Sequence, residues 1–339
     1  MNPVFKAGHE NELEHYFTTL GVHSKYILCD SNTKHHCLQA LYSLFPAWTS
    51  APVICIPAGE ENKNIQQTLT VWEQLHQWEV SRNSILINLG GGMISDLGGF
   101  VASVFKRGIP FLNIPTTLLA MCDAAFGGKT GIDFLQVKNE LGILSNATAT
   151  YINPVFLSTL PLREKRSGLA EVFKHALLDS PLAFQHVQQK TENEFYQLAS
   201  IQQAYEFKLS CTQQDPTDQG IRQQLNFGHS LGHAIESCSM NTPNPLLHGE
   251  AIMLGMEWEL KLSEQLLHCD PLYREELITL KKNYFPALHF ECSFESLWPY
   301  LVHDKKNKDG IRMSLLRSAG DCAWGFQVQK ESLQKLFDA

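Results

Sequence analysis

The stretch SILINLGGGMISDLGGF, residues 84–100, joins an apolar run to three glycines and then to the start of a helical pattern. The run SILINL is short, mostly apolar and bounded by turn residues, which is typical of a buried β-strand. Glycines at 90–92 let the backbone turn sharply and approach a ligand, and the N-terminus of a helix attracts anions. The stretch therefore predicts a strand–turn–helix unit with a phosphate group beside the turn.

The glycines meet the dinucleotide-binding fingerprint G-x-G-x-x-G only in part. Counting from Gly90, Ser95 occupies the third glycine position, and Gly98 and Gly99 follow one turn later. A second stretch, GGKTG at 127–131, resembles the end of a P-loop, but Asp123 stands where a P-loop needs glycine. We therefore expect a nucleotide-binding turn and reject an NTPase.

The sequence around this stretch alternates strands with helices. Between the strands, Ile65, Leu69, Trp72 and Leu75 recur at helical spacing, which predicts a helix with one buried face. Strands that are apolar nearly throughout and alternate with helices favour a parallel sheet covered on both faces. Besides SILINL, the expected strands are KYILCD (25–30), PVICIP (52–57) and IPFLNIP (109–115).

The pattern changes near residue 161. Two prolines bracket a connector at NPVFLSTLP, residues 153–161, and strand signals nearly vanish after it. Long helical patterns take over, in REKRSGLAEVFKHALL, FGHSLGHAIESC and HGEAIMLGMEWELKLSEQLL. We place the boundary between the two expected domains in this connector.

Composition narrows the class of protein. A chain of 339 residues with 44% hydrophobic and 18% charged residues is typical of a globular protein of about two domains. The net charge of −8 provides no basic face for nucleic acid. We expect no signal peptide and no membrane span, because the sequence has neither a leader-like apolar core nor a long apolar run. Nine scattered cysteines without a CxxC motif favour reduced thiols in the cytoplasm.

The second half contains a group of candidate metal ligands. HSLGH puts His229 and His233 four residues apart, on one face of a helix. A zinc protease would carry glutamate at position 230, and Ser230 excludes that motif. His248, at the start of a later helix, and Glu171, surrounded by apolar residues, are further candidates. Two histidines and one carboxylate would leave open positions on a zinc ion, which is the catalytic pattern.

Several ordered blocks resemble the 3-dehydroquinate synthase family of sugar-phosphate cyclases, from about Asp30 to Gly320. The resemblance implies an α/β, Rossmann-like NAD-binding domain over residues 1–158. It also implies a mostly α-helical domain over 159–339 that binds a metal and the substrate. The blocks are GEENK, GGGMISDLGGF, KRGIPFLNIPTTLLAMCDAAFGGKTGI, VKN, GLAEVFKH, GIRQQLNFGHSLGHAIES, LHGEAIMLGM and HDKKNKDG.

The resemblance assigns roles to individual positions. Glu171, His229 and His248 match the ligands of Zn²⁺ or Co²⁺, whereas His233 matches a substrate contact, unlike the assignment from spacing. Arg107 matches an arginine that reaches the neighbouring subunit's site, which implies a homodimer. Residues matching the NAD site are Asp30, Glu60, Lys63, Gly91, Gly92, Asp96, Thr116, Thr117 and Thr159. Residues matching the substrate site are Asp123, Lys129, Lys138, Asn139, Lys174, Lys208, Arg222, Asn226, His233 and Lys305.

The implied reaction converts 3-deoxy-D-arabino-heptulosonate 7-phosphate to 3-dehydroquinate and phosphate. NAD takes a hydride from C5, phosphate leaves by β-elimination, the hydride returns, and the ring opens and recloses as a carbocycle. In the family, the leaving phosphate itself is thought to remove the C6 proton. An anionic sugar-acid phosphate also accounts for a concentration of lysines and arginines in an acidic protein.

Other functions remain open from the sequence. A sibling cyclase would act on a different sugar phosphate. A metal-dependent alcohol or polyol-phosphate dehydrogenase would release NADH, and an inactive homologue would only bind a nucleotide or a partner. The chain also departs from the family pattern at His175, Phe126 and Asn153, and none of these departures removes a matched catalytic residue.

Overall fold

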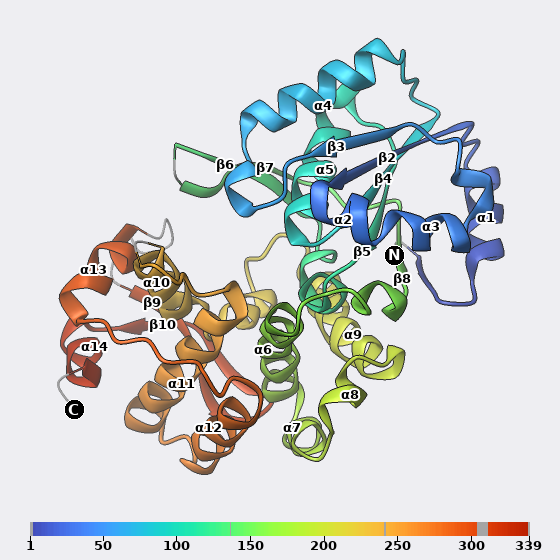
Figure 1. Cartoon of the computed structure of the whole chain (residues 1–339). Coiled ribbons are helices and arrows are strands. Elements are labelled where there is room, and N and C mark those ends of the chain that lie inside the picture. The colour runs from blue at the N-terminus through green and yellow to red at the C-terminus, as the bar shows by residue number, and fades with distance from the viewer. Residues whose placement is uncertain (1–2, 136, 241, 304–310, 338–339) are drawn as a thin grey trace. The chain divides into compact units, whose positions relative to one another are not determined.

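The computed structural model describes residues 3–135, 137–240, 242–303 and 311–337 (Figure 1). Lys305, expected in the substrate site, lies outside the described residues. The chain forms two compact units. The N-terminal unit comprises Met1–Pro161 and Tyr196–Tyr205, and the C-terminal unit comprises Leu162–Phe195 and Glu206–Ala339.

A six-stranded sheet organises the N-terminal unit, in the order β1-β8-β5-β4-β2-β3. Every pairing is parallel, as the apolar runs predict, and β4 is buried along its whole length. The short outer strand β1 and its neighbour β8 were not expected from the sequence. The strands are β1 (Val4–Lys6), β2 (Ser24–Asp30), β3 (Val53–Ile56), β4 (Ser84–Gly90), β5 (Phe111–Pro115) and β8 (Ala149–Ile152).

Helices follow the strands of this sheet and bury an apolar core against it. They are α1 (Glu10–Thr19), α2 (Ser31–His36), α3 (Leu38–Leu44), α4 (Ile65–Gln77) and α5 (Gly92–Val104). Short helical turns lie at η1 (Pro46–Trp48), η2 (Glu60–Asn62), η3 (Phe105–Arg107), η4 (Ala120–Ala124) and η5 (Pro154–Leu157). An antiparallel hairpin of β6 (Lys129–Phe134) and β7 (Val137–Leu144) follows η4.

The buried face of α4 differs from the expected one. Thr68, Val71 and Leu75 are buried, whereas Leu69 is 45% exposed. Thr68 fits the interior because its hydroxyl donates a hydrogen bond to the Asn64 carbonyl at 3.0 Å. A pattern that counts only apolar residues misses such a position, so the prediction for Leu69 was wrong.

The turn between β4 and α5 has the expected strand–turn–helix form. The third glycine of the dinucleotide fingerprint permits close packing of the helix on the sheet. Here Gly98 and Gly99 do this one turn later than the usual position. A Cβ on Gly98 would lie 2.1 Å from Asn88 Oδ1 of β4, and one on Gly99 would lie 2.4 Å from Thr130 Cγ2 of β6. Ser95 in the fingerprint position therefore does not prevent close packing of α5.

The C-terminal unit is mostly helical, as the sequence predicts. Its core also packs against an antiparallel hairpin of β9 (Ile311–Ser318) and β10 (Asp321–Val328), which the sequence did not predict. Among the described residues, none of the helices has both the length and the apolar composition needed to cross a bilayer. The helices are α6 (Leu162–Asp179), α7 (Pro181–Gln188), α8 (Glu192–Phe195), η6 (Ile221–Asn226), α10 (His229–Ser239), α11 (His248–Leu267), α12 (Leu272–Tyr284), α13 (Phe294–His303) and α14 (Lys330–Phe337). The helix α9 (Leu198–Gln214) begins in the N-terminal unit and continues into the C-terminal unit from Glu206.

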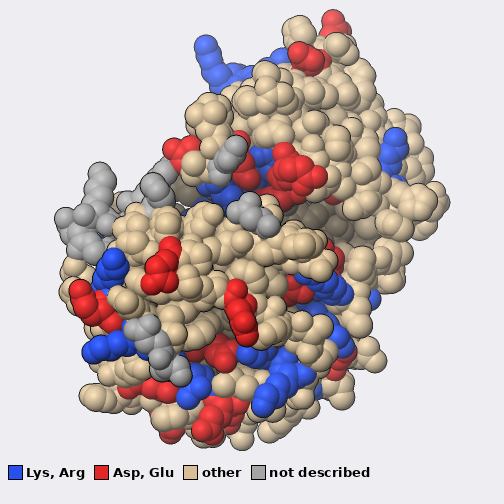
Figure 2. Space-filling view, turned by 60° about the vertical axis from the view of Figure 1, so that its left-hand side comes forward, with Lys and Arg blue, Asp and Glu red and all other residues tan. Residues whose placement is uncertain are grey.

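The charges of both units are mixed in sign. On the face in view in Figure 2, acidic and basic side chains are interspersed over the surface of each unit.

Candidate active site

The residues expected around NAD lie at the carboxyl ends of four neighbouring strands of the N-terminal unit. β5, β4, β2 and β3 are adjacent in the sheet, and in a parallel sheet all these ends share one edge. Open α/β sheets bind ligands at this edge. Asp30 ends β2, Gly91 and Gly92 follow β4, Thr116 and Thr117 follow β5, and Glu60 and Lys63 follow β3.

Buried Lys63 is the centre of a charge cluster at this edge. Its side chain is 4% exposed and pairs with Glu60, with Asp96 at 3.5 Å and with Asp133 at 3.7 Å. Burial disfavours the ammonium form, but Asp96, Glu60 and Asp133 outweigh burial and raise the pKa of Lys63. Asp133 was not expected from the sequence. Its backbone N–H donates to the Lys63 carbonyl at 2.8 Å, so Lys63 ties the start of α4 to the β6–β7 hairpin.

Three other expected NAD residues have local structural partners. Asp30 accepts a hydrogen bond from the Thr33 backbone N–H at 2.8 Å and caps α2. The Thr116 backbone N–H donates to the Gly90 carbonyl at 2.9 Å, which fixes the ends of β4 and β5 together. Thr159 is exposed beyond η5 and hydrogen-bonds Cys37.

The candidate metal centre lies in the C-terminal unit, where α6, α10 and α11 meet. Glu171 Oε1 lies 3.5 Å from His229 Nε2 and 3.6 Å from His248 Nε2, and the Glu171 side chain is 1% exposed. Ligand atoms around tetrahedral Zn²⁺, with bonds of about 2.0–2.2 Å, lie about 3.3–3.6 Å apart. Both distances from Glu171 Oε1 match that spacing, and the ligand atoms of His229 and His248 lie within 4.8 Å of each other. Two imidazoles with a carboxylate suit Zn²⁺ or Co²⁺.

Neighbouring groups orient each of the three candidate ligands. His229 Nδ1 lies 3.1 Å from the Phe227 carbonyl, and His248 Nδ1 lies 3.5 Å from Glu236 Oε2. Both rings thus have a partner at Nδ1 and present Nε2 to Glu171. The Lys174 ammonium lies 2.5 Å from Glu171 Oε2, opposite the oxygen that faces the histidines. Such partners of ligands set ring orientation and metal affinity.

The protonation of the two histidines differs. Burial and the Lys174 ammonium lower the pKa of His229 well below its ordinary value, so its ring is neutral at pH 7. Burial also opposes protonation of His248, but hydrogen bonds with Glu171 and Glu236 prevail and raise its pKa to about 9. A metal ion bound at neutral pH must therefore displace a proton from His248.

His233 lies close to both histidines. Its ring centroid is 5.1 Å from that of His229 and 5.7 Å from that of His248, and its side chain is exposed. The ligand atoms of the three histidines lie within 4.8 Å of one another. The geometry thus permits either role for His233, as a further ligand or as a substrate contact.

Glycines set the spacing of the three helices that carry the ligands. A Cβ on Gly249 of α11 would lie 1.8 Å from the Ser167 carbonyl oxygen of α6. A Cβ on Gly255 of α11 would lie 2.1 Å from the Gly228 carbonyl oxygen, at the start of α10. Because a side chain would not fit at either crossing, the helices approach backbone to backbone.

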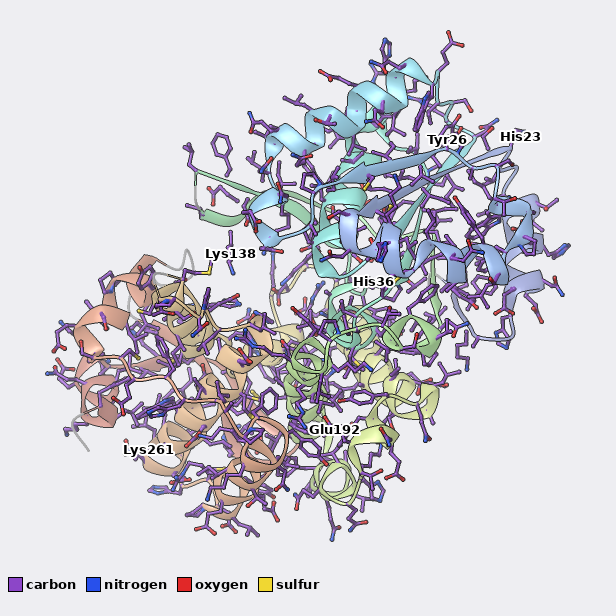
Figure 3. All side chains as sticks on the ribbon, in the orientation of Figure 1. His23, Tyr26, His36, Lys138, Glu192 and Lys261 are labelled. Carbon is purple, nitrogen blue, oxygen red and sulfur yellow. The ribbon has the colours of Figure 1, made fainter. Side chains whose placement is uncertain are left out.

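The other residues expected at the substrate site fall in both units. In the C-terminal unit, Lys174, Lys208 and Arg222 are buried, with 1%, 9% and 3% of their surface exposed, and Asn226 ends η6. Asp215 was not expected to contribute. It accepts backbone hydrogen bonds from Gln219, Gly220 and Arg222, which shapes the loop before η6. In the N-terminal unit, Asp123 lies in η4, Lys129 begins β6, and Lys138 (labelled in Figure 3) and Asn139 lie on β7.

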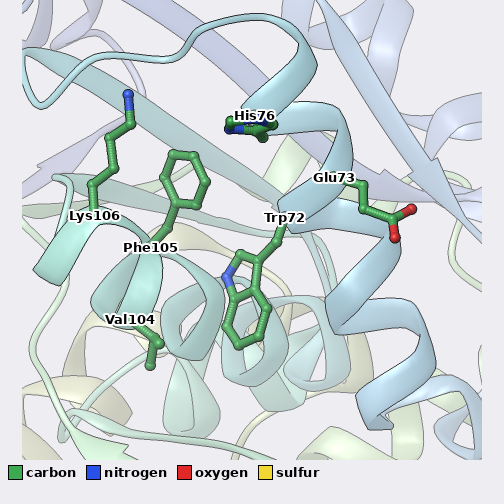
Figure 4. Close-up of a pocket in the computed structure, with 6 residues that line it drawn as sticks. All are labelled: Trp72, Glu73, His76, Val104, Phe105 and Lys106. Atoms are coloured by element: carbon green, nitrogen blue, oxygen red, sulfur yellow. The ribbon is translucent and has the colours of Figure 1, made fainter.

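Arg107 lies in a strained, exposed turn of the N-terminal unit. Lys106, Arg107 and Gly108 have φ of 50°, 67° and 108° in succession. The Arg82 guanidinium stabilises the turn by donating twice to the Lys106 carbonyl, at 3.0 and 2.8 Å. A pocket of about 400 Å³ opens next to the turn (Figure 4). It is lined by Trp72, Glu73, His76, Val104, Phe105 and Lys106.

The departures from the family pattern have local packing partners. Buried His175 lies with Nε2 3.8 Å from Glu171 Oε2. Phe126 stacks on Tyr205 with ring centroids 5.1 Å apart. Asn153 donates to the Tyr151 hydroxyl at 3.0 Å and accepts from the Val155 N–H at 3.0 Å.

Comparisons with known proteins identify the family of the chain. Family profiles described as 3-dehydroquinate synthase N-terminal and C-terminal match residues 53–167 and 168–307. A 3-dehydroquinate synthase from Parabacteroides distasonis is 40% identical over 334 residues, which cover 97% of this chain and 94% of the relative.

Solved structures of sugar-phosphate cyclases share the fold. A 2-epi-5-epi-valiolone synthase from Streptomyces hygroscopicus subsp. jinggangensis, with NAD⁺ and Zn²⁺ bound, is 25% identical with a TM-score of 0.80, covering 99% of this chain and 95% of its own. A 2-deoxy-scyllo-inosose synthase in complex with carbaglucose-6-phosphate, NAD⁺ and Co²⁺ is 22% identical with a TM-score of 0.83, covering 99% and 96%. On the extent and identity of the matches, the chain belongs to the 3-dehydroquinate synthase family.

Proposed function

We propose that this chain converts 3-deoxy-D-arabino-heptulosonate 7-phosphate to 3-dehydroquinate and phosphate, the shikimate-pathway step of its family. The observation that carries the proposal is that one oxygen of buried Glu171 lies 3.5 Å from His229 Nε2 and 3.6 Å from His248 Nε2. When bound, NAD would take a hydride from C5 and return it, and the metal would polarise the oxygens at that end of the substrate.

The N-terminal unit supplies the NAD site in this proposal. The backbone turn at Gly91 and Gly92 precedes the N-terminus of α5, where unsatisfied N–H groups favour a pyrophosphate. Asp96, one turn into α5, pairs with Lys63 at 3.5 Å. We assign it to accept hydrogen bonds from the nucleotide. Asp30, Glu60, Thr116, Thr117 and Thr159 complete the proposed set.

The C-terminal unit supplies the metal ligands and most of the substrate's cationic partners. Lys174 neutralises one oxygen of Glu171 and keeps the other directed at the histidines. Arg222 is buried in a loop ordered by Asp215, and a guanidinium binds a carboxylate through two parallel hydrogen bonds. We assign Arg222 to the substrate carboxylate, with Lys208 as the second choice.

Substrate residues in the N-terminal unit are Asp123, Lys129, Lys138 and Asn139. Asn139 adopts φ of 52°, and its backbone N–H donates to Asp133 Oδ1 at 2.8 Å, which joins β7 to β6. The same carboxylate pairs with Lys63, so the hairpin and the proposed NAD site share Asp133.

The proposed working form is a cytoplasmic homodimer in which Arg107 acts on the partner's site. Arg107 is exposed in a turn that Arg82 holds, and half-exposed Val104 lies next to it. Subunit mixing tests this role. Arg107→Ala and His229→Ala should each be inactive, but mixed subunits should regain activity, because one heterodimer site has every residue intact. No recovery on mixing, with exchange confirmed by tagged subunits, would contradict action across the dimer.

One assay tests the reaction as a whole. Purified protein with Zn²⁺ or Co²⁺ and a catalytic amount of NAD should release inorganic phosphate from the heptulosonate phosphate without net NADH. Stoichiometric NADH would instead identify a dehydrogenase of this fold. Faster turnover of sedoheptulose 7-phosphate, which lacks the carboxylate, would identify a sibling cyclase.

A further inference from the structure

A buried carboxylate on α11 holds the start of α10. Glu259 is 0% exposed, and its two oxygens accept hydrogen bonds from the backbone N–H groups of Gly228 at 2.6 Å and Leu231 at 3.1 Å. Burial raises the pKa of its carboxyl to about 8, although the backbone N–H groups of Gly228, Leu231 and Ser230 oppose this. A glutamate is costly at such a position unless its contacts contribute to structure or function.

The first turn of α10 depends on Glu259 for its cap. The first N–H groups of a helix have no partner within the helix, and a side chain at the N-cap position usually accepts from them. Here the N-cap is Gly228, with φ of 79° and no side chain. A Cβ on Gly228 would lie 2.4 Å from Met256 Cγ, so a capping serine or aspartate has no room. Glu259, from a different helix, supplies the acceptor instead.

The capped turn contains a metal ligand. His229 stands between the two residues whose N–H groups bond to Glu259, and its ring is oriented by the Phe227 carbonyl just before the turn. The other histidine ligand, His248, is the first residue of α11, the helix that carries Glu259. The Glu259 carboxylate therefore joins the backbone around one ligand to the helix that presents the other.

We propose that Glu259 is a positioning residue for the metal centre, which sets the place of His229 relative to His248. The inference rests on the proposed metal site. Alternatively, Glu259 is a helix cap that contributes only to stability. That role predicts no effect of its substitution on metal affinity. The sequence carries no signal for Glu259, because a glutamate in WELKLSEQ resembles an ordinary surface charge.

Two variants remove the contacts in steps. Glu259→Leu keeps a similar volume and loses both acceptors. Glu259→Gln keeps one acceptor oxygen and turns an amide N–H₂ towards the second backbone donor. Glu264→Gln is the matched control, because Glu264 is also on α11 but bonds Arg274 at 2.6 Å and contacts α12 rather than α10.

The readouts are the dissociation constant of Co²⁺, from competition with a chelator, and the visible absorption spectrum of the Co²⁺ protein. Loss of a group that orients a ligand typically weakens metal binding about 10–100-fold. We expect that loss in Glu259→Leu, a smaller one in Glu259→Gln, an altered spectrum in both, and wild-type values in Glu264→Gln.

If Glu259→Leu does not fold, Glu259→Gln alone decides. A folded variant with wild-type Co²⁺ affinity and spectrum would overturn the inference while leaving the metal site intact. An equal loss in Glu264→Gln would also overturn it, because the effect would then belong to α11 in general. Wild-type protein that binds no Co²⁺ would overturn the metal site and this inference together.

Discussion

Replacing Lys174 with methionine tests whether the centre is built around a buried charge pair. The Lys174 ammonium lies 2.5 Å from Glu171 Oε2, and both side chains are 1% exposed. Methionine keeps most of the volume and removes the charge. In metal-free protein the Glu171 carboxylate would then keep protonated His248 near Oε1 but lose the buried ammonium at Oε2.

The expected cost follows from burial. Breaking a buried pair by removing one partner costs about 3–5 kcal/mol of unfolding free energy, because the other charge stays desolvated. Lys281→Met is the matched control. Lys281 pairs with Glu257 in the same unit, but these side chains are 20% and 25% exposed. Exposed pairs contribute about 0.2–1 kcal/mol, so the control should lose little.

Urea unfolding measures both losses, first with a chelator and then with saturating Zn²⁺. In Zn²⁺ the deficit of Lys174→Met should shrink, because the ion compensates the Glu171 charge and stabilises the folded form by mass action. A loss below about 1 kcal/mol in chelator, equal to that of Lys281→Met, would refute the buried-pair argument.

Four further outcomes are expected. His229→Ala should lose bound metal and nearly all turnover, whereas His233→Ala should keep the metal and lose turnover. If elemental analysis finds metal loss in both variants, His233 is a metal ligand. Asp96→Ala should raise the NAD dissociation constant at least about tenfold in calorimetry with unchanged metal content, and unchanged affinity would contradict its assignment. Co²⁺ affinity should increase from pH 6 to pH 8 by up to about tenfold per pH unit. The pKa of His248 is raised to about 9, so its ring must lose a proton before it can bind the ion. A Co²⁺ affinity that does not change with pH would contradict this. In Arg222→Ala, the ratio of kcat/KM for the heptulosonate phosphate to kcat/KM for sedoheptulose 7-phosphate should fall at least about tenfold. An unchanged ratio would mean that another residue binds the substrate carboxylate.

The central sheet could be predicted from sequence because strands buried on both faces leave continuous apolar runs. β4 is buried at every position and was the clearest case. β1 has three residues and β8 has four, too few for a pattern. The β9–β10 hairpin was missed because β9 is interrupted by charge and β10 by a bulge, so neither alternates cleanly.

The residues of the candidate site that could be predicted from sequence are those that belong to a short local motif. HSLGH marked His229 and His233, but spacing alone could not choose among the candidate metal ligands, because Glu171 and His248 lie on other helices. Glu236, Asp133 and Asp215 act through contacts that no local pattern displays. Their carboxylates resemble surface charge until the fold places them beside His248, Lys63 and the loop before Arg222.

The glycine crossings of α6, α10 and α11 limit how this centre can be changed. Where helices touch through side chains, a smaller or larger residue shifts their separation gradually. At Gly249 and Gly255 the contact is backbone on backbone, so there is no side chain left to trim and no space to enlarge. Engineering towards a larger or smaller ion would therefore have to replace the donor groups themselves, while the scaffold keeps one fixed ligand spacing.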